Sequence, residues 1–430
     1  MIPKVCEKLI MSSRSGVVQN MLAKQTSFKA GRLRNFLAQW EGLSSNSVIL
    51  QYVTEVQIEF KGDIMPRQSY HRPSIFNAKE QAIVQAEIDK LITKGVAVPS
   101  SPEKGAFVST IFLRPKKDGS HRTILNLKQF NEFVEYHHFK MDTLETTISM
   151  MKPGCYMASV DLKDAYYMVP IDFSRQKFLT FCFDGQYFQY TRLPNGLASA
   201  PRIFTKLLKL VYSALQGAGH LSSGYIDDSY LQGDTFQECH VNVVDTTTMF
   251  MRLGFFVHPE KSMFVLSQRL TFLGFDLDSV HMTVVPTAAK IKKLCASCNS
   301  LLQKTTPTIR QVAEAISTLV SNFPGAEFRP LHYRHLERDK YKALGANKGD
   351  FLSIMRLSPP ALTELQWWLA NATRLKRNIC YGNPNVIINP TPQSWAGGLY
   401  AVKERRKVDG HRPRLSPTST YLSSLRRSFL

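Results

Sequence analysis

The sequence predicts an α+β fold in which paired strands precede a helical region. Short runs of aromatic and β-branched residues, separated by turn signals such as Asp184-Gly185, recur up to about residue 285 and favour antiparallel hairpins. Amphipathic helices stand between these runs. The clearest covers residues 79–94, with an apolar stripe and Gly95 at its C-terminal end. From Pro286 onward helical periodicity takes over, at residues 288–302, 309–321 and 361–371.

Composition limits the class of protein and its partners. The 430 residues allow roughly two to three domains. Lys and Arg number 54 against 34 Asp and Glu, and the net charge of +20 favours a polyanionic partner, with nucleic acid ahead of an anionic membrane. No apolar run is long enough to span a bilayer, and the first thirty residues lack the core of a signal peptide. We therefore expect an intracellular protein of the cytoplasm, the nucleus or both, without a membrane partner.

Changes of pattern divide the chain into four segments: 1–75, 76–285, 286–379 and 380–430. The first is a basic arm and lead-in, with a helix-like stretch at 34–40 and a strand-like stretch at 53–60. The second holds the strand pairs and the third the helices. The fourth is rich in Pro, Ser and Arg and shows no core pattern. The seven cysteines indicate no disulfide framework, and Cys295-Ala-Ser-Cys298 favours thiols buried in a helix over a zinc site.

Two loops in the second segment are suited to binding. The predicted strands at 107–114 and 122–127 are joined by the basic turn Lys116-Lys-Asp-Gly-Ser120, whose ammonium groups are either solvated or a mobile grip on phosphates. The loop from Arg192 to Pro201, which holds two prolines and a glycine, precedes a helix at 202–215. Such a loop lets the backbone approach a flat partner closely, although it also fits an ordinary strand–helix connection.

Three carboxylates stand at strand ends. The strand at 157–160 ends at Asp161, a typical position for a metal ligand, although an aspartate there also caps a helical turn and Asp164 is suited to that role. Residues 224–233 (Gly-Tyr-Ile-Asp-Asp-Ser-Tyr-Leu-Gln-Gly) predict a hairpin with Asp227 and Asp228 in its turn. Two adjacent carboxylates repel, and a divalent cation such as Mg²⁺ relieves that repulsion. The alternative is a solvated Asp-Asp turn. Together the three could hold two ions about 4 Å apart, as in-line phosphoryl transfer requires.

The order and spacing of five segments resemble the polymerase domain of reverse transcriptases. The resemblance covers roughly residues 30 to 380 and is carried by 161–167, 192–201, 225–228, 253–261 and 272–275. It implies a right-hand polymerase architecture, with fingers, a palm built on an antiparallel sheet and a helical thumb. It also implies an RNA-directed DNA polymerase that adds dNTPs to a primer 3′-hydroxyl on an RNA or DNA template. The flanks most resemble DIRS-type retrotransposons, which pair reverse transcriptase with a tyrosine recombinase, through Gly31–Leu33 before Trp40, His138–Met141, and Arg356–Ser358 followed by Glu364–Trp368.

The resemblance assigns metal and proton-transfer roles by position. Asp161, Asp227 and Asp228 would bind two Mg²⁺ ions, or Mn²⁺ in their place, with help from the Leu162 carbonyl. Lys261 would protonate the leaving pyrophosphate, unless it is simply a solvated lysine.

The resemblance also assigns the nucleotide and primer contacts. Lys116 and Arg122 would contact the incoming triphosphate, while Asn195 and Gly196 would flank the nucleotide. The family more often has Gln or Phe at position 195. Tyr166 would stack under the sugar and exclude a 2′-hydroxyl, which favours deoxyribonucleotides. The primer would lie on a hairpin turn formed by Phe272, Leu273 and Gly274.

The C-terminal segment departs from the family pattern. Residues 386–395 resemble the opening strand of a ribonuclease H domain, but Asn389 stands where the family has its first catalytic aspartate. Only about forty residues follow it, so we expect a degenerate fragment without ribonuclease H activity. The alternative for the whole chain is a catalytically decayed nucleic-acid-binding remnant of a retroelement. The oligomeric state is left open by the sequence.

Overall fold

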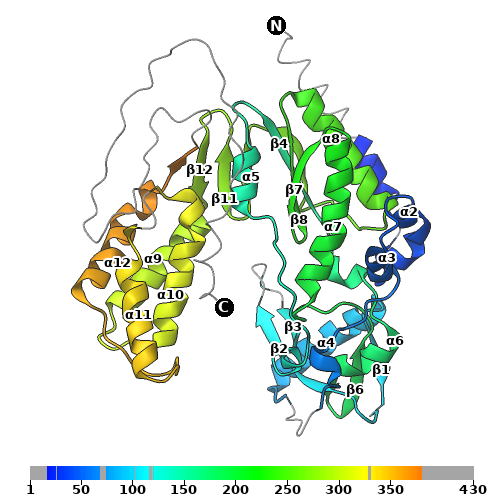
Figure 1. Cartoon of the computed structure of the whole chain (residues 1–430), viewed down its shortest axis with the longest axis horizontal. Coiled ribbons are helices and arrows are strands. Elements are labelled where there is room, and N and C mark those ends of the chain that lie inside the picture. The colour runs from blue at the N-terminus through cyan, green and yellow to red at the C-terminus, as the bar shows by residue number, and fades with distance from the viewer. Residues whose placement is uncertain are drawn as a thin grey trace, which may run out of the picture. The chain divides into compact units, whose positions relative to one another are not determined.

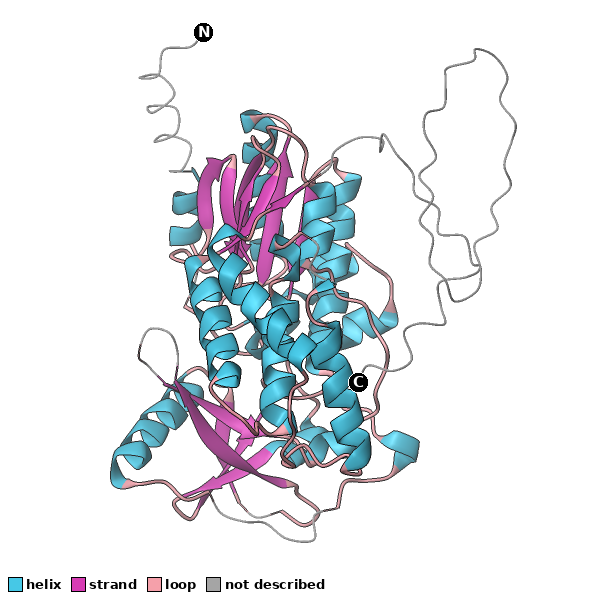
Figure 2. Ribbon diagram, turned by 90° about the vertical axis from the view of Figure 1, so that its left-hand side faces the viewer, coloured by secondary structure: helices cyan, strands magenta, loops and turns pink. Residues whose placement is uncertain are grey.

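A computed structural model describes residues 17–25, 27–67, 74–101, 103–115, 119, 121–327 and 331–379. Within them the strands form three sheets, and the predicted α+β class is confirmed. The strand orders are β1-β6-β5-β2-β3, β7-β8-β4-β9 and β10-β11-β12-β13. The strands gather in two groups in Figure 2, one of them the five-stranded sheet and the other the two four-stranded sheets.

The five-stranded sheet is built from hairpins on either side of one parallel contact. Its strands are β1 (Ala97–Ser100), β2 (Val108–Pro115), β3 (His121–Asn126), β5 (Thr180–Phe183) and β6 (Gln186–Tyr190), of which β2 and β5 are parallel. The Asp184-Gly185 turn has positive φ at both residues, as a tight hairpin turn requires. Helix α4 (Ala78–Thr93) contacts β1 and β3. A capping box between Asn77 and Glu80 starts this helix, and Gly95 follows its end with φ 73°.

The central sheet consists of β4 (Tyr156–Asp161), β7 (Leu221–Tyr225), β8 (Asp228–Gly233) and β9 (Met263–Ser267), all antiparallel. Helices α7 (Ala200–Gly217) and α8 (Phe236–Arg252) pack along it, as Figure 1 shows. Successive residues of β8 face opposite sides of a sheet. Accordingly Leu231 lies in the core shared with α7 and α8, whereas Tyr230 lies in a separate core with β10 and β11.

The second four-stranded sheet joins the central sheet to the helical region. Its strands are β10 (Arg269–Phe272), β11 (Phe275–Asp278), β12 (Thr283–Pro286) and β13 (Arg377–Asn378), and α5 (Leu144–Met150) shares its core. The helices that follow are α9 (Ala288–Leu302), α10 (Ile309–Ser321), α11 (Arg334–Ala346) and α12 (Pro359–Asn371), around a core of their own that includes Trp368 (Figure 1). The predicted change of pattern at 285 falls near the end of β12, just ahead of α9. Cys295 and Cys298 lie on α9 as free thiols.

The lead-in is folded against the central sheet. A 3₁₀ helix η1 (Arg32–Phe36) and α2 (Leu37–Glu41) confirm the predicted helical stretch. Leu33 and Trp40 are fully buried in the core of the central sheet. The strand-like prediction at 53–60 is wrong. Helix α3 (Ser47–Thr54) occupies its start because the Asn46 side chain accepts hydrogen bonds from two backbone N–H groups and caps the helix. Isolated bridges at Val56 and Phe60 follow the helix.

Short elements complete the described chain: η2 (Lys61–Asp63), η3 (Phe130–Glu132), η4 (Ala165–Met168), α6 (Phe173–Gln176), η5 (Lys177–Leu179), η6 (Phe323–Gly325) and η8 (Ala372–Arg374). None of the helices in the described ranges combines the length and apolar character needed to cross a bilayer. Lys116 and residues 380–430, including Asn389 and the ribonuclease H-like stretch, lie outside the described residues. The division into four segments stays a prediction.

Candidate active site

The β7–β8 hairpin places two carboxylates at its tip. Tyr225 and Asp228 are register partners, so Ile226 and Asp227 form a two-residue turn between them. Ile226 has φ 56°, a conformation that is rare for a β-branched residue and that gathers at functional sites. The turn is held from the neighbouring strand end, because the Leu162 N–H donates to the Asp227 carbonyl at 2.9 Å. The predicted hairpin is therefore confirmed, with Asp228 as the first residue of β8.

Strand β4 brings the third carboxylate to the same end of the sheet. Asp161 is its last residue and lies directly opposite Asp228 in the antiparallel register. Such cross-strand partners have Cβ atoms about 4.5–5.5 Å apart. The backbone of Asp161 is fixed on both sides, since its N–H donates to the Ser262 hydroxyl at 3.0 Å and its carbonyl accepts from the His258 N–H at 2.8 Å. Asp161 thus lies at the same end of the sheet as Asp227 and Asp228, although a long stretch of chain separates it from them.

Burial and mutual repulsion make these carboxylates reluctant to ionise. Burial, reinforced by neighbouring carboxylates, raises the pKa of Asp161 and of Asp228 from an ordinary 3.8 to about 6. For Asp228 both Asp227 and Asp161 add to the rise, and the pKa of Asp227 is itself raised, chiefly by burial. The Lys261 ammonium opposes the rise in all three pKa values. The repulsion expected from the sequence is therefore present.

The donor set fits a hard divalent cation. Across the residues that the structure describes, no three His, Cys, Asp or Glu side chains converge on one point as a ready-made metal site. The three aspartates nevertheless share one sheet end, and their carboxylate oxygens are the ligands that Mg²⁺ prefers. A bound cation would also offset the repulsion that raises their pKa values. Leu162 lies between Asp161 and the turn, where its N–H holds Asp227.

A cavity of about 510 Å³ opens beside these carboxylates. Asp161, Leu162 and Asp227 line it, together with three residues expected at the nucleotide site, Arg122, Tyr166 and Asn195. Four cationic side chains face the same space: Lys94, Arg122, Lys163 and Lys261. The structure therefore gathers metal-binding, sugar-binding and phosphate-binding candidates around one cavity. Lys116, on the predicted β2–β3 turn, is outside the described residues.

Tyr166 forms one wall of the cavity. It lies on η4, just after β4, and its ring packs edge-on against Phe204 of α7 with centroids 5.5 Å apart. Burial and the nearby Asp227 carboxylate raise the pKa of its phenol, which stays neutral. The next residue, Tyr167, is buried, and its hydroxyl accepts a hydrogen bond from the Asn195 side chain at 3.3 Å. Asn195 thereby connects the 192–196 loop to η4.

Two supporting residues carried no recognisable sequence signal. Asn131 makes two hydrogen bonds to the loop, donating to the Gly196 carbonyl and accepting from the Ala198 N–H, both at 2.9 Å. Lys94, at the end of α4, forms an ion pair with Asp164 at 2.6 Å. Asp164 makes no capping hydrogen bond to η4, so its predicted capping role is wrong; the carboxylate is engaged by Lys94 instead.

The predicted primer-binding turn lies away from this cavity. Leu273 and Gly274 form the β10–β11 turn, with φ of 48° and 79°. Phe272 is only 4% exposed, and its ring packs against Tyr230 at 5.7 Å. Any contact with a nucleic acid would therefore come from the turn and not from the Phe272 ring. The primer-binding role of Phe272, Leu273 and Gly274 stays a prediction.

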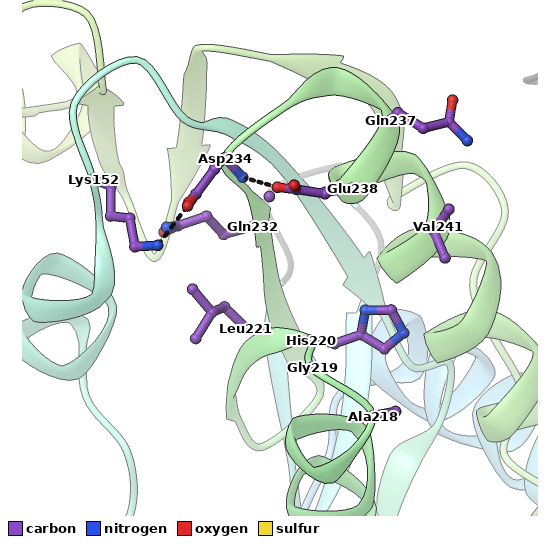
Figure 3. Close-up of a pocket in the computed structure, with 11 residues that line it drawn as sticks. Lys152, Ala218, Gly219, His220, Leu221, Gln232, Asp234, Gln237, Glu238 and Val241 are labelled. Atoms are coloured by element: carbon purple, nitrogen blue, oxygen red, sulfur yellow. Dashed lines mark hydrogen bonds and ion pairs between the residues drawn. The ribbon is translucent and has the colours of Figure 1, made fainter.

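A second cavity, of about 470 Å³, lies at the opposite end of the same hairpin (Figure 3). Leu221 and Gln232, which are register partners in β7 and β8, line it. Figure 3 shows the ion pair between Lys152 and Asp234 at 2.6 Å and the hydrogen bond from the Asp234 N–H to Glu238. None of the site residues predicted from the sequence lines this second cavity. The candidate chemistry belongs to the tip of the hairpin.

Comparison with protein families identifies the segment that carries this site. Residues 114–277 match the family described as Reverse transcriptase (RNA-dependent DNA polymerase). The match contains Asp161, Tyr166, Asp227, Asp228 and Lys261, and it identifies this segment as a reverse transcriptase domain of the kind found in retroelement and retroviral polyproteins.

Curated relatives are much longer than this chain. The chain is 24% identical over 296 residues to the Pro-Pol polyprotein of simian foamy virus type 1, an overlap of 68% of this chain and 24% of the relative. It is 29% identical over 226 residues to an uncharacterized protein of Caenorhabditis elegans, covering 52% and 17%. It is 22% identical over 238 residues to the retrovirus-related Pol polyprotein from transposon 412 of Drosophila melanogaster, covering 54% and 18%. The chain thus spans about a quarter or less of these relatives' length.

Solved structures share the fold. A foamy viral protease-reverse transcriptase in complex with double-stranded DNA superimposes with a TM-score of 0.59 at 17% identity, over 86% of this chain and 66% of that chain. The same viral protein with an RNA/DNA hybrid gives a TM-score of 0.55 at 19% identity, over 81% and 47%. The right-hand polymerase architecture expected from the resemblance is confirmed as the fold of this chain. The assignment of fingers, palm and thumb to particular segments of this chain stays a prediction.

Proposed function

We propose that the protein is an RNA-directed DNA polymerase, the reverse transcriptase of a retrotransposon, which adds dNTPs to a primer 3′-hydroxyl. One observation carries the proposal: within a reverse transcriptase domain, Asp161 and Asp228 are cross-strand partners beside Asp227. Phosphoryl transfer by two metal ions needs acidic ligands in that arrangement. The retained carboxylates also favour a working enzyme over a decayed nucleic-acid-binding remnant.

The metal site proposed here consists of Asp161, Asp227 and Asp228, with the Leu162 carbonyl as a further ligand. Two Mg²⁺ ions, or Mn²⁺ in their place, would lower the pKa of the primer hydroxyl and neutralise charge on the leaving pyrophosphate when bound. The chain's own contribution is to hold the carboxylates in register at one end of the sheet. Lys261, whose charge already acts on all three carboxylates, would serve as the proton donor to pyrophosphate.

The cavity walls would then bind the nucleotide. Arg122 would hold the triphosphate, and Lys116 is proposed for the same role. Asn195 and Gly196 would flank the base and sugar, steadied by the bonds of their loop to Tyr167 and Asn131. Tyr166 would lie under the sugar, where its ring would leave no space for a 2′-hydroxyl. These placements support DNA synthesis over RNA synthesis.

The proposed partner is a template–primer duplex. Foamy viral protease-reverse transcriptase, which shares the fold, has been solved with double-stranded DNA and with an RNA/DNA hybrid. The chain has 54 basic against 34 acidic residues, and this excess of positive charge favours binding of a nucleic-acid duplex. The β10–β11 turn would support the primer end. The finer assignment to DIRS-type retrotransposons rests on the flanking segments Gly31–Leu33, His138–Met141 and Arg356–Ser358, and belongs to the proposal.

Primer extension tests this function. The purified chain should extend a DNA primer on RNA and on DNA templates when Mg²⁺ is present, and Asp227→Asn should abolish extension while leaving duplex binding intact. The matched control is Asp89→Asn, because Asp89 is an exposed α4 residue whose carboxylate accepts a hydrogen bond from Gln85. Full activity in Asp227→Asn would refute the proposal. Salt-sensitive duplex binding by the wild type without any extension would instead select the remnant.

A further inference from the structure

Asp161 is held in place by a short ladder between two segments. The Lys163 N–H donates to the Phe256 carbonyl and the His258 N–H to the Asp161 carbonyl, both at 2.8 Å, with Leu162 opposite Val257. In this pattern the N–H and C=O of Val257 itself point away from Leu162. The position of Val257 therefore fixes where Asp161 lies relative to Asp227, to which Leu162 is bonded.

The outward side of Val257 is occupied by one side chain from the lead-in. The Gln25 amide donates to the Val257 carbonyl at 3.2 Å and accepts from the Val257 N–H at 3.0 Å. A primary amide used in this way supplies the donor and acceptor that a further strand would supply. Val257 is fully buried, so loss of the amide would leave two buried backbone groups without partners.

The lead-in is attached to the rest of the site at three more points. The Gly31 N–H donates to the Tyr167 carbonyl at 2.7 Å, and the Ala30 N–H to the Lys94 carbonyl at 3.0 Å. The Phe28 ring packs edge-on against Phe256, with centroids 5.8 Å apart. Gly31 has φ 71°, and the Arg192 guanidinium fills the space that a Cβ would need. The lead-in thus contacts η4, which carries Tyr166, and the segment around Phe256 that pairs with Asp161 and Lys163.

We propose that Gln25, Phe28, Ala30 and Gly31 of the lead-in are part of the catalytic scaffold. Gln25 is a positioning residue, which holds Asp161 in register with Asp227 through Val257 and Leu162. The inference deepens the proposed polymerase function and rests on it. Gln25 lies well outside the segment 114–277 that matches the reverse transcriptase family, so the match does not assign it a role. Its effect is exerted through the backbone and not through contact with substrate.

Gln25→Met tests the inference, because methionine keeps the length of the side chain and removes both hydrogen bonds. We expect kcat to fall by about tenfold or more, equivalent to about 1.4 kcal/mol, since small displacements of catalytic groups are costly. The KM for dNTP and the Kd for primer–template should stay within about twofold of wild type. Gln25→Glu, which places an acceptor against the Val257 carbonyl in place of the donor, should lower kcat at least as far and serves if Gln25→Met fails to fold. Gln39→Met, at an exposed glutamine of α2, is the matched control and should change nothing.

Amide hydrogen exchange gives a second measurement that does not depend on activity. In Gln25→Met the amides of Lys163 and Val257 should exchange faster, and the two buried backbone groups left without partners should lower the melting temperature by a few degrees without weakening duplex binding. Unchanged kcat and unchanged exchange would overturn the inference. So would a joint fall of kcat, duplex affinity and melting temperature, which would indicate a general loss of fold. If wild-type protein extends no primer, the proposed function fails, and exchange at these two amides alone decides whether Gln25 positions the ladder.

Discussion

Replacing Asp228 with Asn should stabilise the protein when no divalent cation is present. In the folded chain, burial and the neighbouring Asp227 and Asp161 carboxylates raise the pKa of Asp228 from 3.8 to about 6. Between these two values the folded state binds more protons than the unfolded state. Stability therefore falls as pH rises through this window, and the full destabilisation persists above it. The Asp228→Asn substitution removes the charge that causes this destabilisation.

The size of the effect follows from the same values. The pKa of Asp228 is about 2 higher in the folded state than in the unfolded state. Each pKa unit corresponds to about 1.36 kcal/mol, so the difference amounts to about 3 kcal/mol. Asp228 is half-buried, and solvent screening reduces this to about 1 kcal/mol. For a chain of this size we expect a rise in melting temperature of about 2 °C.

Thermal unfolding in the presence of a chelator, at about pH 7.5 and again at about pH 4, measures the stabilisation by Asp228→Asn. Asp228→Asn should melt above wild type at the higher pH and close to it at the lower, where the wild-type carboxyl is protonated in the folded state and partly protonated in the unfolded state. Added Mg²⁺ should raise the melting temperature of wild type more than that of the variant. Asp89→Asn should follow wild type throughout. Equal melting temperatures at pH 7.5, or a gain that is the same at both pH values, would refute the electrostatic reasoning.

Three further substitutions test other parts of the site. Tyr166→Ala should let the enzyme incorporate ribonucleotides, and unchanged discrimination in primer extension would remove Tyr166 as the sugar gate. Gly254→Ala should lower the free energy of unfolding by about 2 kcal/mol, because Gly254 has φ 87° and its missing Cβ faces the Phe36 ring; urea unfolding with an unchanged midpoint would contradict this. Lys94→Met should raise the KM for dNTP about threefold by releasing Asp164, whereas Lys90→Met, at an exposed α4 lysine, should leave it unchanged.

The sequence predicts what local chemistry determines. The Asp-Asp hairpin, the capping box of α4 and the 184–185 turn are all specified by residues within a few positions of one another. The wrong strand prediction at 53–60 shows the limit of such local signals. The β-branched residues there favour a strand, but the helix that begins after the cap at Asn46 extends to Thr54. Strand pairing between Asp161 and Asp228 became predictable only through the family resemblance.

The supporting contacts could not be predicted, because their partners are backbone atoms or distant charges. Gln25 bonds to the N–H and C=O of a residue 232 positions away, and any residue other than proline offers the same two groups. Asn131 likewise bonds to the backbone of the 196–198 loop. The Lys94–Asp164 pair spans 70 positions with no pattern to connect its members. Such contacts leave no periodicity or motif in the sequence.

The part of the chain that matches the reverse transcriptase family holds the carboxylates but not all that keeps them in place. Lys94 lines the cavity, and Trp40 donates from its indole to the Leu253 carbonyl at 2.9 Å, in the core that the central sheet shares with α7 and α8. Gln25 completes the ladder at Val257. The pKa values of all three carboxylates are raised, so their ionised forms destabilise the end of the sheet that bears them. Gln25, Trp40 and Lys94 all lie ahead of position 114, so the contacts that support this end of the sheet extend beyond the segment that matches the family.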